Sequence, residues 1–115
     1  MESCFDEERH DFESYLIKTF NYSNKVAKDC ASRCKRIENH VTSDLSNSVS
    51  NIDEFENLII KIQLYATTVC KNKKTAYTLT GSLRAAARKY AFYLYPCEAI
   101  DYPSAHGKSK YRLDS

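Results

Sequence analysis

The chain has 115 residues, of which 43% are hydrophobic and 28% charged, and its formal net charge is +2. This length allows one folded domain with a single core, and the composition is that of a globular protein rather than a disordered one. No apolar run approaches the roughly 20 residues that span a bilayer, and the acidic start MESCFDEERH is unlike a signal peptide. The odd number of cysteines, five, suits reduced thiols. These features predict a cytoplasmic protein that has no membrane partner.

Only two glycines and two prolines occur in the chain, so long helices are expected. Apolar residues recur at helical spacing in four segments, which predicts helices over about residues 11–20, 23–41, 52–70 and 82–94. Ser23 is placed to cap the second helix, and Pro96 is expected to end the fourth. Loops are predicted over residues 42–51 and 71–77. The sequence therefore predicts an all-α bundle.

Charge is distributed unevenly along the chain. The net charge is −4 over residues 1–20, +3 over 21–42, −3 over 43–69 and +6 over 70–95. In a helical bundle such blocks can separate into a basic and an acidic face, and this separation says more about partners than the total charge does.

Cys30 and Cys34 are one helical turn apart, which is the spacing that two metal ligands on one helix face need. A tetrahedral site needs two further ligands, and the chain has no C-x-x-C or H-x-x-x-H pair to supply them. Both cysteines instead continue the apolar stripe of the second helix, with Val26, Ile37 and Val41. We predict that they pack in the core, and we expect neither a metal nor another cofactor.

The sequence contains no recognisable catalytic constellation. Nucleophilic catalysis needs a base within hydrogen-bond reach of a cysteine or serine, and His10, His40 and His106 belong to no known motif. The chain has only Gly81 and Gly107, so it has no glycine-rich phosphate loop. We therefore expect a protein that is not an enzyme.

The stretch LRAAARKYAFYL, residues 83–94, resembles the last helix of the core-binding, SAM-like domain of tyrosine recombinases (phage integrases). A related helix is found in modules attached to some restriction-type nucleases. The matching positions are Leu83, Arg84, Ala86, Arg88, Lys89, Tyr90 and Leu94. Upstream, DFESYLIKTF and YSNKVAKDCASRCKRIE resemble two earlier helices of that domain. The resemblance covers residues 11–95, which leaves residues 1–10 as an acidic N-terminal segment and residues 96–115 as a C-terminal tail.

The resemblance implies a four-to-five-helix SAM-like bundle that lies along duplex DNA, in a protein of a phage or another mobile element. In that family the catalytic arginines, histidine and tyrosine belong to a separate domain that this sequence does not show. Tyr111, in KSKYRLDS, lacks the arginines and histidine that would activate a nucleophilic tyrosine. The first hypothesis is therefore a non-catalytic DNA-binding module.

Basic residues of the second and fourth predicted helices, and of the loop before the fourth, are the candidate DNA contacts. Lysine and arginine neutralise backbone phosphates and release counterions, although a basic helix face is also commonly just solvated. We expect the two helices to present these residues on a common outer surface. The candidates are Lys25, Lys28, Lys35, Arg36, Lys71, Lys73, Lys74, Arg84 and Arg88.

Two alternatives to duplex binding remain open at this point. One is a helical interaction factor, an inhibitor or accessory protein, whose acidic face binds a protein partner; that face would comprise Glu7, Glu8, Asp11, Glu13, Asp53, Glu54 and Glu56. Another is stacking of aromatic residues on a single strand, although such residues more often pack; they are Tyr65, Tyr77, Phe92, Tyr93 and Tyr95. A homodimer through the aromatics of residues 92–95 and the tail is compatible with either function.

Overall fold

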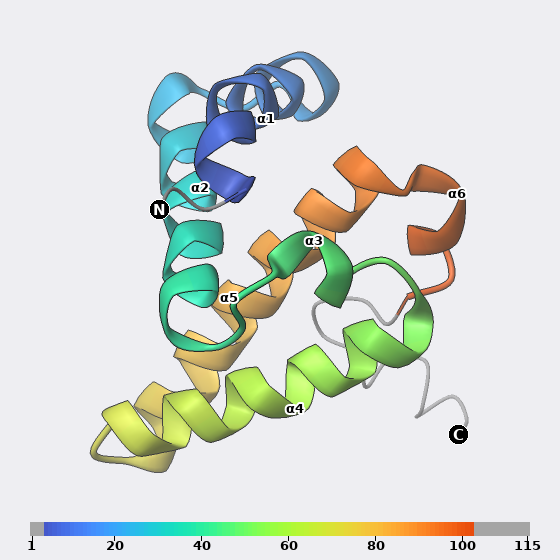
Figure 1. Cartoon of the computed structure of the whole chain (residues 1–115). Helices are drawn as coiled ribbons and strands as arrows, with labels where there is room; N and C mark the ends of the chain where they lie inside the picture. Colours follow the sequence, from blue (N-terminus) through green and yellow to red (C-terminus); the bar gives the residue numbers. More distant parts are fainter. Residues whose placement is uncertain (1–3, 103–115) are drawn as a thin grey trace, which may run out of the picture.

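The computed structural model describes residues 4–102, and these residues form helices and connecting turns without a β-strand (Figure 1). The helices are α1 (Cys4–Phe20), α2 (Asn24–His40), α3 (Leu45–Ser48), α4 (Ile52–Val69), α5 (Lys73–Leu94) and α6 (Pro96–Ala99). The predicted all-α bundle is thereby confirmed. None of these helices is both long enough and apolar enough to cross a membrane.

Short polar side chains fix where the helices begin. The Ser23 hydroxyl accepts a hydrogen bond from the Val26 amide at 3.2 Å, as predicted for the start of α2. The Asn51 side chain caps α4 in the same way, and Asn72 caps α5 by accepting from the Thr75 amide at 2.8 Å. These bonds satisfy backbone N–H groups that a helix leaves without an internal partner.

Two predicted helix starts are wrong. α1 begins at Cys4 rather than near residue 11, because Phe5 is fully buried and anchors the extra turns in the core. α5 begins at Lys73 rather than near residue 82, so most of the predicted loop over 71–77 is helical. Gly81 lies inside α5, where its cost of about 1 kcal/mol relative to alanine is outweighed by the Asn72 cap and by packing against α4.

Tyr90 of α5 lies at the centre of an aromatic cluster with α1. Its fully buried ring is 5.3 Å from those of both Phe5 and Phe12, in edge-to-face geometry, and Tyr93 continues the cluster 5.5 Å from Phe12. The Tyr90 hydroxyl donates a hydrogen bond of 2.7 Å to the Glu8 carboxylate, and burial is the main cause that raises the pKa of Tyr90. This cluster joins α1 to the C-terminal half of α5.

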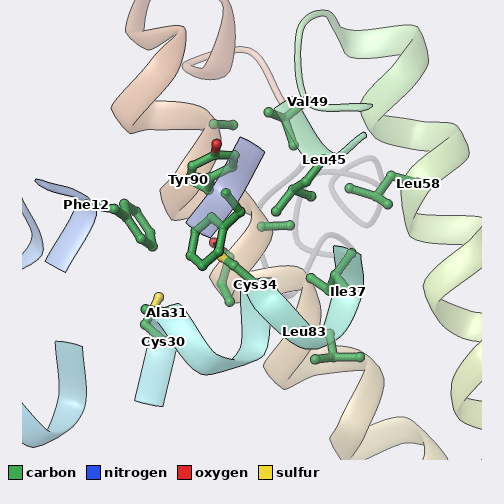
Figure 2. Packing of buried hydrophobic residues seen from close by; sticks show 14 of the residues in the cluster. Phe12, Cys30, Ala31, Cys34, Ile37, Leu45, Val49, Leu58, Leu83 and Tyr90 are labelled. Atoms are coloured by element: carbon green, nitrogen blue, oxygen red, sulfur yellow. Dashed lines mark hydrogen bonds between the residues drawn. The ribbon is translucent and has the colours of Figure 1, made fainter. Parts of the chain in front are cut away.

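Small residues allow α2 and α5 to approach closely. Ala86, Ala87 and Ala91 of α5 are buried, and the Cys34 thiol of α2 donates to the Ala86 carbonyl over 3.4 Å. Cys30 is buried beside it, so the prediction that both cysteines pack in the core is confirmed. Figure 2 shows core side chains from five helices converging here; those labelled include Phe12, Cys34, Leu45, Leu58 and Tyr90.

The apolar stripes were predicted in part. On α2, Val26 is 43% exposed, and Ala27 and Ala31 are buried instead because α1 packs against that side of the helix. On α4, Val69 is 48% exposed, since it lies in the last turn before the turn into α5. The central positions of the α2 stripe, Cys30, Cys34 and Ile37, are buried as predicted.

α4 and the first half of α5 form an antiparallel hairpin. In Figure 1 its turn, drawn in yellow, lies far from α1 and from α6. The buried side of α4 consists of Phe55, Leu58, Ile62 and Ala66. The residues at the turn contribute little to the core and are mostly exposed to solvent.

Candidate nucleic-acid interface

Lys71, Lys73 and Lys74 lie together at the turn between α4 and α5, and we call this group the lysine tip. All three side chains are exposed, and Lys73 and Lys74 occupy the first turn of α5. Within residues 4–102 the ion pairs are Arg9–Glu13, Lys25–Asp29 and Lys28–Glu13, so no carboxylate there neutralises the tip. Among the nine candidate DNA contacts, these three lysines are the group that the structure brings together.

The electrostatics of the lysine tip oppose helix formation. The N-terminus of a helix carries a partial positive charge, which acidic side chains stabilise and basic ones destabilise. α4 follows this rule with Asp53 and Glu54 in its first turn, whereas the first turn of α5 contains no acidic residue. Free backbone N–H groups, a helix dipole and lysines together make the start of α5 attractive to an anion such as phosphate.

Tyr77 adds an aromatic ring beside the lysine tip. It lies one helical turn after Lys73 and Lys74 and is 70% exposed. The other aromatic residues considered for base stacking are partly buried against the core; they are Tyr65, Phe92, Tyr93 and Tyr95. Of the five, Tyr77 is thus the one placed to meet a ligand.

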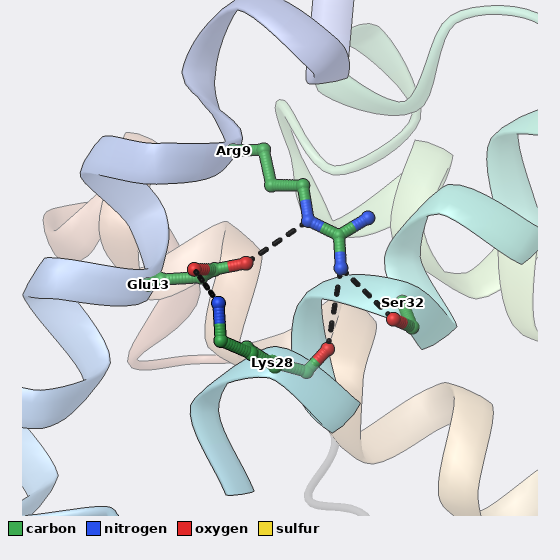
Figure 3. A network of polar contacts seen from close by, with 4 residues as sticks. All are labelled: Arg9, Glu13, Lys28 and Ser32. Carbon is green, nitrogen blue, oxygen red and sulfur yellow. Dashed lines mark hydrogen bonds and ion pairs between the residues drawn. The ribbon is translucent and has the colours of Figure 1, made fainter. Parts of the chain in front are cut away.

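The candidates in the first half of α2 lie beside α1 instead. Lys25 pairs with Asp29 at 3.3 Å, and the Lys28 ammonium is 3.9 Å from the Glu13 carboxylate. Figure 3 shows that Glu13 also accepts a bond of 2.9 Å from Arg9, whose guanidinium reaches Ser32 of α2 at 2.9 Å. This network ties α1 to α2, and its carboxylate offsets part of the positive charge of Lys28.

Arg36 and Lys35 make contacts within the protein. The Arg36 Nε donates a hydrogen bond of 2.8 Å to the Tyr65 hydroxyl of α4, and its guanidinium lies 5.4 Å from the centre of that ring. His40 stacks on the same ring at 5.7 Å. Lys35 is half-buried and interacts with its surroundings. Arg36 and His40 thus help to join α2 to α4.

Arg84 and Arg88 are half-buried on the flank of α5. One terminal nitrogen of Arg88 donates to the Tyr102 carbonyl oxygen over 3.5 Å, and the guanidinium lies 4.9 Å from the Phe92 ring centre. Burial lowers the pKa of Arg88. Arg84 also has an interaction within the protein. Arg88 therefore takes part in packing the segment after α6 against α5.

The nine candidates do not share one face. Lys25 and Lys28 lie at the end of the molecule where α1 packs, and the lysine tip lies at the opposite end of the view in Figure 1. Arg88 borders Tyr102 instead. The candidates fall into four groups rather than on the common outer surface that was expected; these are the lysine tip, Lys25 with Lys28, Lys35 with Arg36, and Arg84 with Arg88.

Two basic residues that were not among the candidate contacts have clear structural roles. Lys89 places its ammonium 5.1 Å from the Phe20 ring centre and 5.8 Å from that of Tyr22, so it binds the turn between α1 and α2. Arg9 organises the network with Glu13, and the spacing of four residues between them was a readable signal for this ion pair.

Other chemistry has less support within the described chain. Residues 4–102 contain no group of three or more histidine, cysteine, aspartate or glutamate side chains that could hold a metal ion. His10 and His40 are exposed, and burial raises the pKa of the Cys34 thiol well above its ordinary value. His106 and Tyr111 lie outside the described residues.

In comparisons with known proteins, no family model, no curated protein and no solved structure matches this chain.

Proposed function

We propose that the protein is a non-catalytic DNA-binding module that contacts the backbone of a duplex through the lysine tip. The observation that carries this proposal is the exposed cluster of Lys71, Lys73 and Lys74 at the positive end of the longest described helix, without a neutralising carboxylate. Such a cluster costs folding free energy, and an anionic partner offsets that cost.

The physical basis of binding is neutralisation of phosphates. Three phosphate contacts give a slope of log K against log salt of about −2.7, which is a loss of about 40-fold in affinity between 50 and 200 mM salt. Contacts of this kind position the protein without reading sequence. The exposed ring of Tyr77, one helical turn after Lys73 and Lys74, is proposed to pack against a sugar of the same strand.

Fluorescence anisotropy with a labelled random duplex of about 20 base pairs, across a salt series, tests the proposal. Replacing Lys73 and Lys74 by alanine should reduce the magnitude of the salt slope by about 2. The matched control is Lys25→Ala/Lys28→Ala, which removes the same charge at the other end of the molecule. Equal slopes for wild type and the tip variant would exclude the lysine tip as the contact.

The resemblance to integrase core-binding domains supports the same class of function and a mobile-element origin. Some of the positions that match this family have structural roles in this chain, because Tyr90 is buried in the core and Lys89 packs over aromatic rings. The motif of α5 therefore relates more directly to the bundle than to DNA contact. The lysine tip supports the DNA contact in this proposal. The resemblance supports the biological setting, a phage or another mobile element.

A protein-interaction factor is the second candidate, and a specific observation favours it. Ile60 and Leu64 of α4 are 55% and 64% exposed and lie on the side opposite the core. The acidic face has less support, since Glu8 accepts from Tyr90 and Glu13 pairs with two basic side chains. Absence of duplex binding at low salt, with stable binding of a protein, would favour this candidate.

A further inference from the structure

The most exposed aromatic ring of residues 4–102 lies in a part of the chain that has no acidic residue. No aspartate or glutamate occurs between Glu56 and Glu98, whereas seven lysines and arginines do. Four of these cations, Lys61 and the lysine tip, are exposed. Tyr77, beside the tip, is 70% exposed. A polyanion is therefore attracted to the same turns of α5 that present a free ring.

Tyr77 shares one side of α5 with two lysines of the tip. It follows Lys73 by four residues and Lys74 by three, and residues at these separations on a helix have Cβ atoms about 5–6 Å apart. Thr75 and Thr78 are exposed as well, so this end of the helix is open to solvent. A nucleotide whose phosphate contacts Lys73 or Lys74 can thus place its sugar or its base on the ring of Tyr77.

The number of free rings favours one unpaired nucleotide over a long single strand. Proteins that bind single strands stack successive bases on several aromatic side chains along a basic groove. The rings of Tyr65, Phe92, Tyr93 and Tyr95 are partly buried against the core, which leaves one free ring beside the lysine tip. The lysines suit backbone phosphates of paired and unpaired nucleotides alike. One stacked base among bound duplex phosphates is the arrangement that these side chains fit.

The part of the nucleotide that the ring meets depends on whether the base is paired. In a continuous duplex each base is covered by its neighbours in the stack, so the ring reaches only a sugar. An unpaired base can turn a free face to an aromatic side chain. We infer that the lysine tip and Tyr77 together recognise DNA in which an unpaired nucleotide interrupts a duplex, with phosphates bound by the lysines and the base stacked on Tyr77. This inference rests on the proposed function and specifies the DNA that the site prefers.

Fluorescence anisotropy of the full chain with three labelled DNAs tests this inference. The first is a blunt duplex of about 20 base pairs, and the second has an unpaired adenine at its centre. The third has an abasic nucleotide at that position, so it keeps the phosphate and lacks the base. The wild type should bind the adenine bulge about 10-fold more tightly than the abasic bulge, because the two DNAs differ in the base that stacks.

Substitution of the ring tests the assignment to Tyr77. Tyr77→Ala should bind the two bulged DNAs equally, and its affinity for the blunt duplex should change by less than about 2-fold because phosphate contacts dominate there. Tyr77→Phe keeps the ring and should keep the preference. Leu64→Ala, which shortens an exposed apolar side chain of α4, is the matched control and should behave as the wild type does. A preference for the adenine bulge that survives in Tyr77→Ala would overturn the assignment.

The lysine variant separates this inference from the proposed function. Lys73→Ala/Lys74→Ala should weaken binding to all three DNAs, while the ratio between the two bulged DNAs stays at about 10. Equal wild-type affinity for the two bulged DNAs, with duplex binding that still depends on the lysine tip, would overturn the inference and leave the proposed function standing. Absence of binding to every DNA at low salt would overturn both.

Discussion

The C-terminal half of α5 packs among aromatic side chains of α1, whereas the first two turns of the same helix are exposed beside the turn that follows α4. In the first region, Tyr90 is fully buried between Phe5 and Phe12 and its hydroxyl is bonded to Glu8. In the second, lysines occupy the helix start and Tyr77 is 70% exposed. One helix thus combines a region that is buried in the core with a region that is mostly exposed to solvent.

The difference helps to separate structural residues from candidate functional ones. A basic residue in the packed half, such as Arg88 or Lys89, is held by rings or backbone carbonyls and contributes to packing. A basic residue in the exposed half lies where the helix dipole disfavours it. Substitutions in the two halves should therefore affect stability in opposite directions.

Truncation of the central ring should have the largest effect. Tyr90→Ala removes a fully buried ring from contact with two others, and we expect the free energy of unfolding to fall by about 3–5 kcal/mol. Urea denaturation followed by circular dichroism measures the change. Tyr77→Ala, at an exposed ring of the same helix, should change stability by less than about 0.5 kcal/mol. Equal effects of the two substitutions would contradict the assignment of the core.

Alkaline pH should reduce stability through the packed half. Burial raises the pKa of Tyr90 and of Cys34 above their ordinary values of 10.0 and 9.0, so the folded state keeps these protons more tightly than the unfolded chain. For Tyr90 this stabilisation is complete below about pH 10 and is lost as pH rises toward the folded-state pKa, by about 1.4 kcal/mol per unit.

Urea denaturation at several pH values between 7 and 11 tests this pH dependence. Tyr90→Phe should show a shallower decline than the wild type above pH 10, because it removes one of the titrating groups. A wild-type stability that stays constant up to pH 11 would contradict the burial of the Tyr90 hydroxyl.

Arg88→Ala should have a moderate effect. The substitution removes a half-buried guanidinium that contacts the Tyr102 carbonyl and the Phe92 ring, so we expect a loss of about 1 kcal/mol. DNA affinity should be unchanged. Arg33→Ala, at an exposed arginine of α2, is the control and should alter neither quantity. Loss of DNA binding without loss of stability would return Arg88 to the group of DNA contacts.

The sequence predicted the elements whose signals are local. α2 was placed within one residue at each end because Ser23 caps it and its apolar residues are regularly spaced. The start of α5 was missed because Lys73 to Thr78 has little apolar periodicity, and that part is held by the Asn72 cap and by α4. A helix boundary that depends on packing against another helix leaves no signal in the local sequence pattern.

The candidate DNA contacts differ in the same way, between those set by neighbours in sequence and those set by packing. Lys71, Lys73 and Lys74 were predicted as a basic group, and they lie together because they are neighbours in sequence. Arg88 was also predicted at the surface, but the chain after α6 folds back so that Tyr102 contacts it. That contact joins residues 14 positions apart, so the spacing of residues within α5 could not predict it.

Reversal of charge at the start of α5 should have the smallest effect on stability and the most informative one. Lysines 73 and 74 disfavour the helix end at which they lie and favour phosphate there. The variant Lys73→Glu/Lys74→Glu should therefore unfold with a free energy about 0.3–1 kcal/mol higher than the wild type, and it should lose binding to duplex DNA at low salt. A variant that is less stable than the wild type, or that binds duplex DNA equally well, would contradict the account.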